Sequence, residues 1–355
     1  MSKFEQARDI YQKALSISPQ DARVYNNLGN ALRKLHNFEE AKSAYESSLA
    51  LRPNDNDTRL NYANILHYLK SYVEAESVYK ALITENVDDP SVYVNLSSTL
   101  LFQHKIREAL RVCDLGLGKF KNNVELLFSK GHLLGASEKL DESEKTLCQL
   151  LALDPQNGAA LQALSIHYFL QGRWSEAWEA YEARFITGKV ARRPFPYKMW
   201  EGQDLKGQKI LVWGEQGVGD EIMFASMLPD LLRLGGDVHY ETDPRLIPLL
   251  QRSFPEINFY EKNDPPLLNI QKASFEFQSP SGNLGRWLRK TELDFDKTEE
   301  FLVADPSRVA ELKKNYKENG KTLVGVAWRS ENPDIGKKKS LNLKQLNDLF
   351  KLSNI

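Results

Sequence analysis

Small and apolar residues return at a spacing of 34 through the first 185 residues of the chain. A period of this length predicts a solenoid of helix pairs, because each pair cannot bury its apolar face alone and stacks on its neighbours. A stack of this kind also offers an extended surface to a partner. The columns that carry the period are Ala7, Ala41, Ala75, Ala109 and Ala177 with Ser143; Tyr11, Tyr45, Tyr79, Cys113, Leu147 and Tyr181; and Phe38, Tyr72, Ile106, Leu140 and Trp174.

The unit from residue 22 to residue 55 carries the pattern most completely. Gly29 and Ala41 are small enough for two helices to approach closely, and Pro53 ends the second helix. This pattern resembles the tetratricopeptide repeat. The resemblance implies an α-helical repeat superhelix over residues 1–185, made of one half repeat and five full repeats.

Three asparagines, Asn27, Asn61 and Asn95, repeat on the first helices of successive pairs, which line the concave side of such a stack. A carboxamide offers both a donor and an acceptor, so a column of them suits the backbone of an extended peptide. The column resembles the asparagine ladder of O-GlcNAc transferases, which implies a protein or peptide in the repeat groove. Ser129 and Ala163 replace asparagine in the last two units. The alternative interpretation is that asparagine only suits a solvent-facing position.

The periodicity stops after residue 185. Residues 186–207 combine prolines with aromatic residues, which indicates an extended connector. The apolar run 210–213, the glycine turn 214–220 and helical spacing over 222–232 then predict a strand, a turn and a helix. Further strands are expected at residues 237–242, 257–260 and 274–278, with a helix over 244–253. This order predicts a Rossmann-like α/β domain over residues 208–320, whose ligand site lies at the carboxyl ends of the strands.

The turn Trp-Gly-Glu-Gln-Gly-Val-Gly-Asp, residues 213–220, carries the candidate chemistry. It lacks the Lys-Ser/Thr of a nucleotide-binding P-loop, and its glycine order disfavours a dinucleotide-dependent oxidoreductase. The whole motif resembles bacterial repeat-containing glycosyltransferases related to the family 9 heptosyltransferases, which have the GT-B fold. The resemblance implies that Asp220 is the general base that deprotonates an acceptor hydroxyl during hexosyl or heptosyl transfer.

Several residues around Asp220 enter this hypothesis. Gly217 and Gly219 lack side chains, so an acceptor is able to approach the backbone. Glu215 and Glu221 are alternative bases, and the structural alternative is that Asp220 only caps a helix. The same resemblance implies an acceptor-facing loop of Ser281, Gly282 and Asn283, and the alternative for Ser281 is that it caps a helix.

Residues 321–355 match only the first strand, 323–328, and the first helix, 343–350, of the donor-side domain of that family. The resemblance implies that Arg329, Lys339 and Ser340 lie near the phosphates of a nucleotide sugar, which is a donor substrate; no cofactor is expected. The alternative is that this lysine run is only solvated surface. A complete domain needs about 100 residues. We therefore expect that this polypeptide alone does not complete a nucleotide sugar pocket.

The amino-acid composition narrows the classes of function that are open to this chain. The chain of 355 residues has 47 basic and 48 acidic side chains, so no global field draws it to nucleic acid. No run approaches the roughly 18 apolar residues of a membrane span, and a cytoplasmic protein is expected. The two cysteines and six histidines show no metal or disulfide spacing. Two functions remain: a glycosyltransferase whose repeats present a protein or glycan acceptor, and a non-catalytic interaction scaffold.

Overall fold

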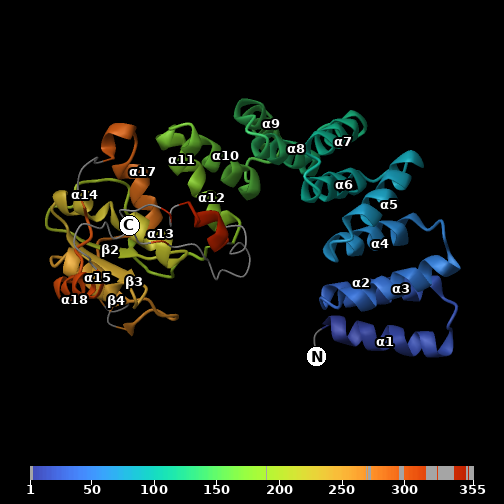
Figure 1. Ribbon diagram of the computed structural model, residues 1–355, viewed down its shortest axis with the longest axis horizontal. Coiled ribbons are helices and arrows are strands. Elements are labelled where there is room, and N and C mark those ends of the chain that lie inside the picture. Colours follow the sequence, from blue (N-terminus) through green and yellow to red (C-terminus); the bar gives the residue numbers. More distant parts are fainter. Residues whose placement is uncertain are drawn as a thin grey trace. The chain divides into compact units, whose positions relative to one another are not determined.

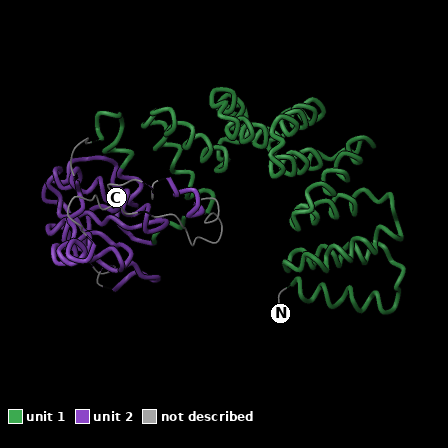
Figure 2. The backbone as a smooth tube through the Cα atoms, viewed as in Figure 1, with its two compact units in different colours: residues 1–193, 285–295 green, residues 194–284, 296–355 purple. Residues whose placement is uncertain are grey.

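The computed structural model describes residues 3–188, 190–268, 270, 273–295, 300–316, 326, 340–348 and 351. The chain divides into two compact units (Figure 2). The first, here called the repeat unit, holds residues 1–193 and 285–295, and the second, the α/β unit, holds residues 194–284 and 296–355.

The repeat unit is built from consecutive helices that pack in pairs along the chain (Figure 1). The predicted helical solenoid is therefore confirmed. Its helices are α1 (Lys3–Ile17), α2 (Ala22–Lys34), α3 (Phe38–Leu51), α4 (Asn56–Tyr68), α5 (Tyr72–Thr84), α6 (Pro90–Phe102), α7 (Ile106–Lys119), α8 (Val124–Ala136), α9 (Leu140–Leu153), α10 (Gly158–Leu170), α11 (Trp174–Tyr181) and α12 (Ala183–Ile186).

Small residues set the distance between the helices of a pair. Ala41, Ala75 and Ala109 are fully buried. A Cβ atom on Gly29 would lie 2.6 Å from the ring of Tyr45, and one on Gly131 would lie 2.7 Å from the side chain of Leu147. The glycines therefore leave room for the large residue of the facing helix, and the period of 34 places this contact at equivalent positions of different repeats.

A segment that follows the α/β strands in sequence completes the repeat unit. This segment contains most of α17 (Leu284–Leu288) and the short helix η2 (Glu292–Asp294). The Trp178 indole nitrogen donates to the Arg289 carbonyl oxygen at 2.9 Å, and the rings of Trp174 and Phe295 lie 4.4 Å apart. A Cβ atom on Gly285 would overlap the Trp178 ring. Residues 285–295 thus pack against α11 and belong to the same compact unit (Figure 2).

The α/β unit contains a parallel sheet of five strands among its described residues. Its strand order is β1-β5-β2-β3-β4, and β2 is paired on both sides. Ile210 in β2 lies opposite Val238 in β3 and Phe277 in β5. Four of the five β2 residues are buried, as a central parallel strand requires. The strands are β1 (Lys198–Met199), β2 (Lys209–Trp213), β3 (Asp237–Thr242), β4 (Asn258–Glu261) and β5 (Phe277–Pro280).

The helices of this unit differ from the prediction in two places. The helix expected over 222–232 is divided, because Pro229 cannot donate a backbone hydrogen bond in a continuous helix. The helix expected from residue 343 is a short 3-10 turn in its described part, and the strand expected at 323–328 lies outside the described residues except for Val326. The elements are α13 (Val218–Ala225), α14 (Leu228–Arg233), α15 (Ile247–Ser253), η1 (Ser281–Asn283), α18 (Pro306–Tyr316) and η3 (Leu343–Leu346).

The connector also contributes to the sheet. Residues 198 and 199 form β1, which pairs with β5, and the Gln278 side chain donates to the carbonyl oxygens of Phe195 and Tyr197 at 2.8 Å. The sheet is small and parallel, as expected. The finer assignment of this unit to a Rossmann-like half of a GT-B fold stays a prediction.

Candidate functional site

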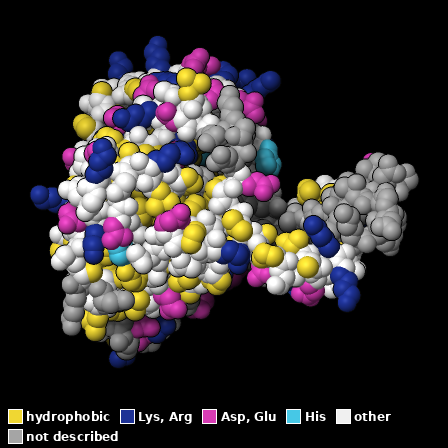
Figure 3. All heavy atoms as spheres, turned by 90° about the vertical axis from the view of Figure 1, so that its left-hand side faces the viewer, with side chains coloured by type: hydrophobic (Ala, Val, Ile, Leu, Met, Phe, Trp, Pro, Cys, Tyr) yellow, Lys and Arg dark blue, Asp and Glu magenta, His cyan; other side chains and the backbone are white. Residues whose placement is uncertain are grey.

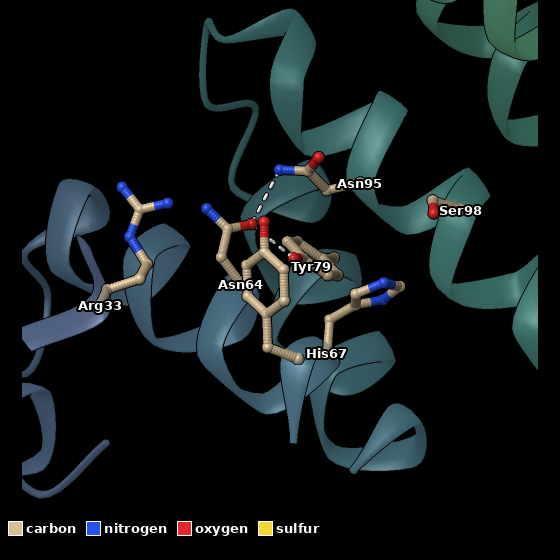
Figure 4. A pocket seen from close by; sticks show the side chains of 7 residues that line it. Arg33, Asn64, His67, Tyr79, Asn95 and Ser98 are labelled. Carbon is tan, nitrogen blue, oxygen red and sulfur yellow. Dashed lines mark hydrogen bonds between the residues drawn. The ribbon is translucent and has the colours of Figure 1, made fainter. Parts of the chain in front are cut away.

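A pocket of about 320 Å³ opens on the first helices of three consecutive repeats (Figure 4). We call it the amide pocket. Repeat-related positions line it, since Arg33 and His67 stand 34 residues apart, as do Asn64 and Ser98. Its lining residues are Arg33 on α2, Asn64, His67 and Tyr68 on α4, Tyr79 on α5, and Asn95 and Ser98 on α6.

Two neighbours hold the Asn64 side chain in one orientation. Its Oδ1 atom accepts hydrogen bonds from the Tyr79 hydroxyl at 2.7 Å and from Asn95 Nδ2 at 2.8 Å (Figure 4). Burial raises the pKa of Tyr79, so its hydroxyl remains a donor. Because the oxygen already accepts two bonds, the amide nitrogen is the group that Asn64 offers to a ligand. Tyr45 and Asn30 repeat this bond at 2.9 Å one unit earlier.

The hydrogen bonds around His67 assign its tautomer. Thr99 Oγ1 donates its single proton to the Asn95 carbonyl oxygen at 2.7 Å and lies 2.9 Å from His67 Nδ1. Nδ1 therefore carries a proton and donates to Thr99, which leaves Nε2 as an acceptor. Burial lowers the pKa of His67 and favours this neutral form.

The amide pocket is rich in donors. Arg33 supplies a guanidinium group whose Nε atom is buried and has no hydrogen-bond partner within the part of the chain that the structure describes. Asn64 supplies an amide group and Ser98 a hydroxyl. No aspartate or glutamate lines the pocket. The site therefore presents one positive charge, several donors and the acceptors of His67 and Asn95, a set that suits a polar, extended ligand.

The three predicted ladder asparagines differ in their surroundings. Asn95 lines the amide pocket. Asn61 Nδ2 donates to Asn26 Oδ1 at 3.1 Å, and Asn27 is exposed. The structure brings Asn95 together with Asn64, which the sequence analysis did not single out. A signal for Asn64 was present, since Asn30, Asn64 and Ser98 form a second polar column.

In the α/β unit, the predicted glycine turn connects β2 to α13. Gly217 and Gly219 are exposed, and a Cβ atom on Gly219 would meet no atom within 4 Å. Asp220 is half-buried, and its Oδ2 atom accepts from the Gly217 backbone nitrogen at 3.1 Å. Among the described residues its Oδ1 atom has no partner. Asp220 is thus a cap of α13 that keeps one oxygen available.

The two alternative acids are enclosed. Glu221 is 1% exposed, and its Oε2 atom accepts from Thr242 Oγ1 at 2.5 Å and from the Asp243 backbone nitrogen at 3.0 Å. A Cβ atom on Gly214 would lie 2.5 Å from the Glu221 carboxylate. Glu215 is 2% exposed and accepts from the Gly282 backbone nitrogen at 2.8 Å. Both acids connect loops at the carboxyl end of the sheet, and Gly214 leaves space for the Glu221 carboxylate.

The remaining predicted residues have different surroundings. Ser281 and Gly282 are buried, whereas Asn283 is half-buried. Among the described residues, the buried hydroxyls of Ser281 and Tyr240 form no hydrogen bond of standard geometry, although the two side chains interact with each other. Ser340 is half-buried. Arg329 and Lys339 lie outside the described residues.

Two further properties limit the kinds of site that the described residues form. Within them, no group of three or more His, Cys, Asp or Glu side chains is arranged to hold a metal ion. None of their helices combines the length and the apolar character needed to cross a bilayer. On the face in Figure 3, basic and acidic side chains are interspersed, and hydrophobic side chains gather near its middle.

The repeats match known family models. Residues 22–55 and 128–189 match models of the tetratricopeptide repeat, and residues 1–35 match a further model of the same repeat. The matched stretches of the repeat unit are therefore tetratricopeptide repeats. Between them, the helices from α4 to α7 continue the same pattern of pairs.

Three known proteins are similar to parts of this chain. Protein FlbA of Caulobacter vibrioides is 35% identical over 228 residues, which cover 57% of this chain and 38% of that protein. YrrB, described as a tetratricopeptide repeat protein with an unusual peptide-binding site, is 20% identical, with a TM-score of 0.39 over 50% of this chain and 91% of its own. TTC0263 of Thermus thermophilus is 20% identical, with a TM-score of 0.42 over 48% of this chain and 92% of its own.

Proposed function

We propose that this protein binds an extended segment of a partner protein along the first helices of its repeats, with the amide pocket as the central contact. The observation that supports this most directly is the fixed Asn64 side chain. Two hydrogen bonds hold its oxygen, so its amide nitrogen is preorganised as a donor to a peptide carbonyl.

The amide pocket also offers hydrogen-bond acceptors, which suit the N–H groups of a peptide backbone. His67 Nε2 and Asn95 Oδ1 are able to accept from peptide nitrogens, while Asn64 and Ser98 donate. A backbone offers donors and acceptors in alternation, so a pocket with both kinds recognises it without reading a particular side chain. The neighbouring repeats extend the same surface on either side of the pocket.

The test uses the full chain and a displayed library of short random peptides. Asn64→Ala removes the fixed donor and leaves Tyr79 without its acceptor, so the affinity of a selected peptide is expected to fall about tenfold. Gln149→Ala is the matched control, because Gln149 is an exposed amide on α9 that does not line the pocket. Equal affinities of the two variants, or the recovery of no binding peptide at all, would contradict the proposal.

A second candidate function is sugar transfer to an acceptor bound at the carboxyl end of the parallel sheet. The exposed Gly217 and Gly219 support it, together with the available Oδ1 atom of Asp220 beside them. A carboxylate at this place is able to take a proton from an attacking hydroxyl, and ligands of open parallel sheets bind at this edge. The resemblance of residues 213–220 to glycosyltransferases supplies the reaction class.

The experiment for the second candidate measures transfer of radiolabel from a panel of nucleotide sugars to the selected peptide or to glycans. Asp220→Asn is expected to lower the transfer rate about 100-fold or more, as loss of a general base does. Glu256→Gln removes an exposed acid of the same unit and serves as control. No transfer from any donor, or unchanged transfer by Asp220→Asn, would count against catalysis through this residue.

A further inference from the structure

We infer that Trp178, on the last repeat helix, is a positioning residue for the loop Ser281–Asn283 at the carboxyl end of the sheet. It acts through residues 285–295, which continue from this loop and pack against α11. This positioning is a property of the fold that goes beyond peptide binding and sugar transfer. It depends on two anchors at the two ends of one short stretch of chain.

The first anchor holds the loop to the glycine turn. The Glu215 side chain, which is 2% exposed, accepts from the Gly282 backbone nitrogen at 2.8 Å. The turn that carries Glu215 leads into α13, and α13 contacts η1. The place of the loop beside α13 therefore depends on a bond between groups that lie 67 residues apart in the sequence.

The second anchor lies on α11, in the repeat unit. The Trp178 indole nitrogen donates to the Arg289 carbonyl oxygen at 2.9 Å, and the Ser175 hydroxyl donates to the Lys290 carbonyl oxygen at 3.2 Å. The Trp178 ring also fills the space beside Gly285, where an added Cβ atom would overlap it. The indole bond is buried, and a buried carbonyl that loses its donor is costly. Trp178 thus fixes both the start and the middle of the segment.

A continuous helical stretch joins the two anchors. η1 ends at Asn283 and α17 begins at Leu284, whose backbone is right-handed helical with φ −55° and ψ −37°. Leu284 is fully buried, and the Arg289 backbone nitrogen donates to the Gly285 carbonyl oxygen at 3.0 Å. Only two residues separate Gly282 from Gly285. Because hydrogen-bonded helical turns move as rigid elements, a shift at Gly285 is carried to Gly282.

The loop therefore depends on the last repeat. If α11 releases the segment, the helical stretch gains freedom, and the bond between Gly282 and Glu215 loses its fixed geometry. Ligands of open parallel sheets bind at the carboxyl ends of the strands, which is where this loop lies. A partner that moves α11 would in this way change the edge of the sheet without touching it.

The experiment measures hydrogen exchange of single backbone amides in the full chain by mass spectrometry. Trp178→Phe keeps a ring beside Gly285 and removes the donated hydrogen bond, so exchange of the Gly282 amide is expected to become about tenfold faster. Gly285→Ala should have the same effect, because its methyl group displaces the segment from the indole ring. Neither a peptide nor a sugar donor is needed, so the result is independent of both proposed functions.

Two matched controls separate positioning from a general loss of stability. Tyr79→Phe removes another buried aromatic donor of the repeat unit, the one that bonds Asn64 at 2.7 Å. Gly131→Ala overpacks the same unit against Leu147, with a Cβ atom at 2.7 Å. Both should speed exchange only in their own helix pairs and leave the Gly282 amide unchanged. Control variants that speed exchange at Gly282 as much as Trp178→Phe does would overturn the inference.

Coupling through one segment also acts in the reverse direction. Glu215→Gln weakens the bond to the Gly282 nitrogen and is expected to speed exchange of the Arg289 amide about threefold. The double variant of Trp178 and Glu215 should speed exchange at Gly282 by less than the product of the two single effects, because both act on one stretch. Multiplying effects, or an unchanged Gly282 amide in Trp178→Phe and Gly285→Ala, would show that the anchors are independent and would contradict the inference.

Discussion

The two units differ in the buried polar groups that predominate in them, although the repeat unit also holds one buried carboxylate with distant partners, Glu76. In the repeat unit, buried hydroxyls donate to carbonyl oxygens of adjacent helices: Ser143 bonds Gly131 at 2.6 Å and Ser165 bonds Ala177 at 3.0 Å, each across 12 residues. In the α/β unit, buried carboxylates join distant loops. Glu215 reaches Gly282 across 67 residues, and Glu221 reaches Thr242 across 21.

Because of this difference, we expect stability to be local in the repeat unit and shared across the whole of the α/β unit. A hydroxyl that loses its acceptor affects one helix pair, and each repeat depends mainly on its neighbours. A buried carboxylate that loses its partners is an uncompensated charge, and the loops that it joined lose their connection together. We therefore expect single substitutions to have local effects in the repeats and effects on the whole unit in the α/β fold.

The largest expected effect is that of Glu221→Ala. The change leaves the Thr242 hydroxyl and the Asp243 backbone nitrogen without their acceptor and removes the ion pair to Lys262 at 3.5 Å. Each of the two donors that is left without an acceptor costs about 1–3 kcal/mol, so this substitution is expected to have the largest total cost of those considered. Hydrogen exchange measured by mass spectrometry should show faster exchange throughout β2 and β3, with no change in α2 to α6. Glu256→Ala is the control, and an exchange increase confined to α13 would contradict the distributed effect.

The same contrast explains what the sequence was able to predict. The period of 34 recurs so often that the helices of the repeat unit follow from it, since each repeat supports the assignment of the next. The amide pocket is harder to predict from the sequence. Arg33 and His67 stand at equivalent positions of successive repeats but are different residue types, so no repeated pattern marks them. The orientation of the Asn64 side chain depends on its hydrogen bond with Tyr79. Of the residues that line the pocket, only Asn95 belongs to the predicted asparagine ladder, whereas Asn64 belongs to the column of Asn30, Asn64 and Ser98.

In the α/β unit, strands with a clear local sequence pattern are predictable, whereas a strand that depends on a distant partner is not. Strand β2 is predicted because apolar residues run continuously from Ile210 to Trp213, and strand β3 because Val238, Tyr240 and Thr242 alternate with polar residues. Strand β1 was missed because residues 198 and 199 form a two-residue strand with no apolar run, and only the distant β5 defines it. Asp220 follows the glycines at a position that fits both a cap and a base, and the sequence alone does not separate those roles.

The second prediction concerns packing in the repeats. Gly29→Ala places a methyl group 2.6 Å from the fully buried Tyr45 ring, which has to move. Overpacking of this kind costs about 1–3 kcal/mol. Hydrogen exchange should become faster in α2 and α3 and remain unchanged in α8 to α10, where Gly131 and Leu147 make the same contact independently. Faster exchange across all repeats would show that stability in this unit is not local.

A smaller, pH-dependent effect is expected at Glu76, a buried acid of the repeat unit. Burial raises the pKa of this carboxyl, but hydrogen bonds from Lys105, Lys80 and Gln103 outweigh it and lower the pKa from 4.5 to about 2. A lowered folded-state pKa gives stability that is present above the unfolded value and is lost as the pH falls from about 4.5 toward 2. Glu76→Gln should therefore be less stable than the original chain at pH 7 by about 1–2 kcal/mol.

Urea denaturation followed by circular dichroism at several pH values tests this directly. The difference between Glu76→Gln and the original chain should shrink below pH 4.5 and vanish near pH 2. A difference that stays constant over this range would mean that the charge of Glu76 contributes nothing and that only its shape matters.

The smallest expected effect is an increase in stability, caused by Gly118→Ala. This is the same glycine-to-alanine change as at Gly29, made at a position without a close contact. Gly118 is exposed near the end of α7, and a Cβ atom added there would meet no atom within 4 Å. Alanine restricts the unfolded chain more than glycine does, so Gly118→Ala should stabilise the protein by about 0.5 kcal/mol. Hydrogen exchange in α7 should slow slightly while α2 and α3 keep their rates. If Gly29→Ala and Gly118→Ala instead change stability in the same direction, helix propensity rather than the contact with Tyr45 governs these positions, and the local packing account of the repeat unit fails.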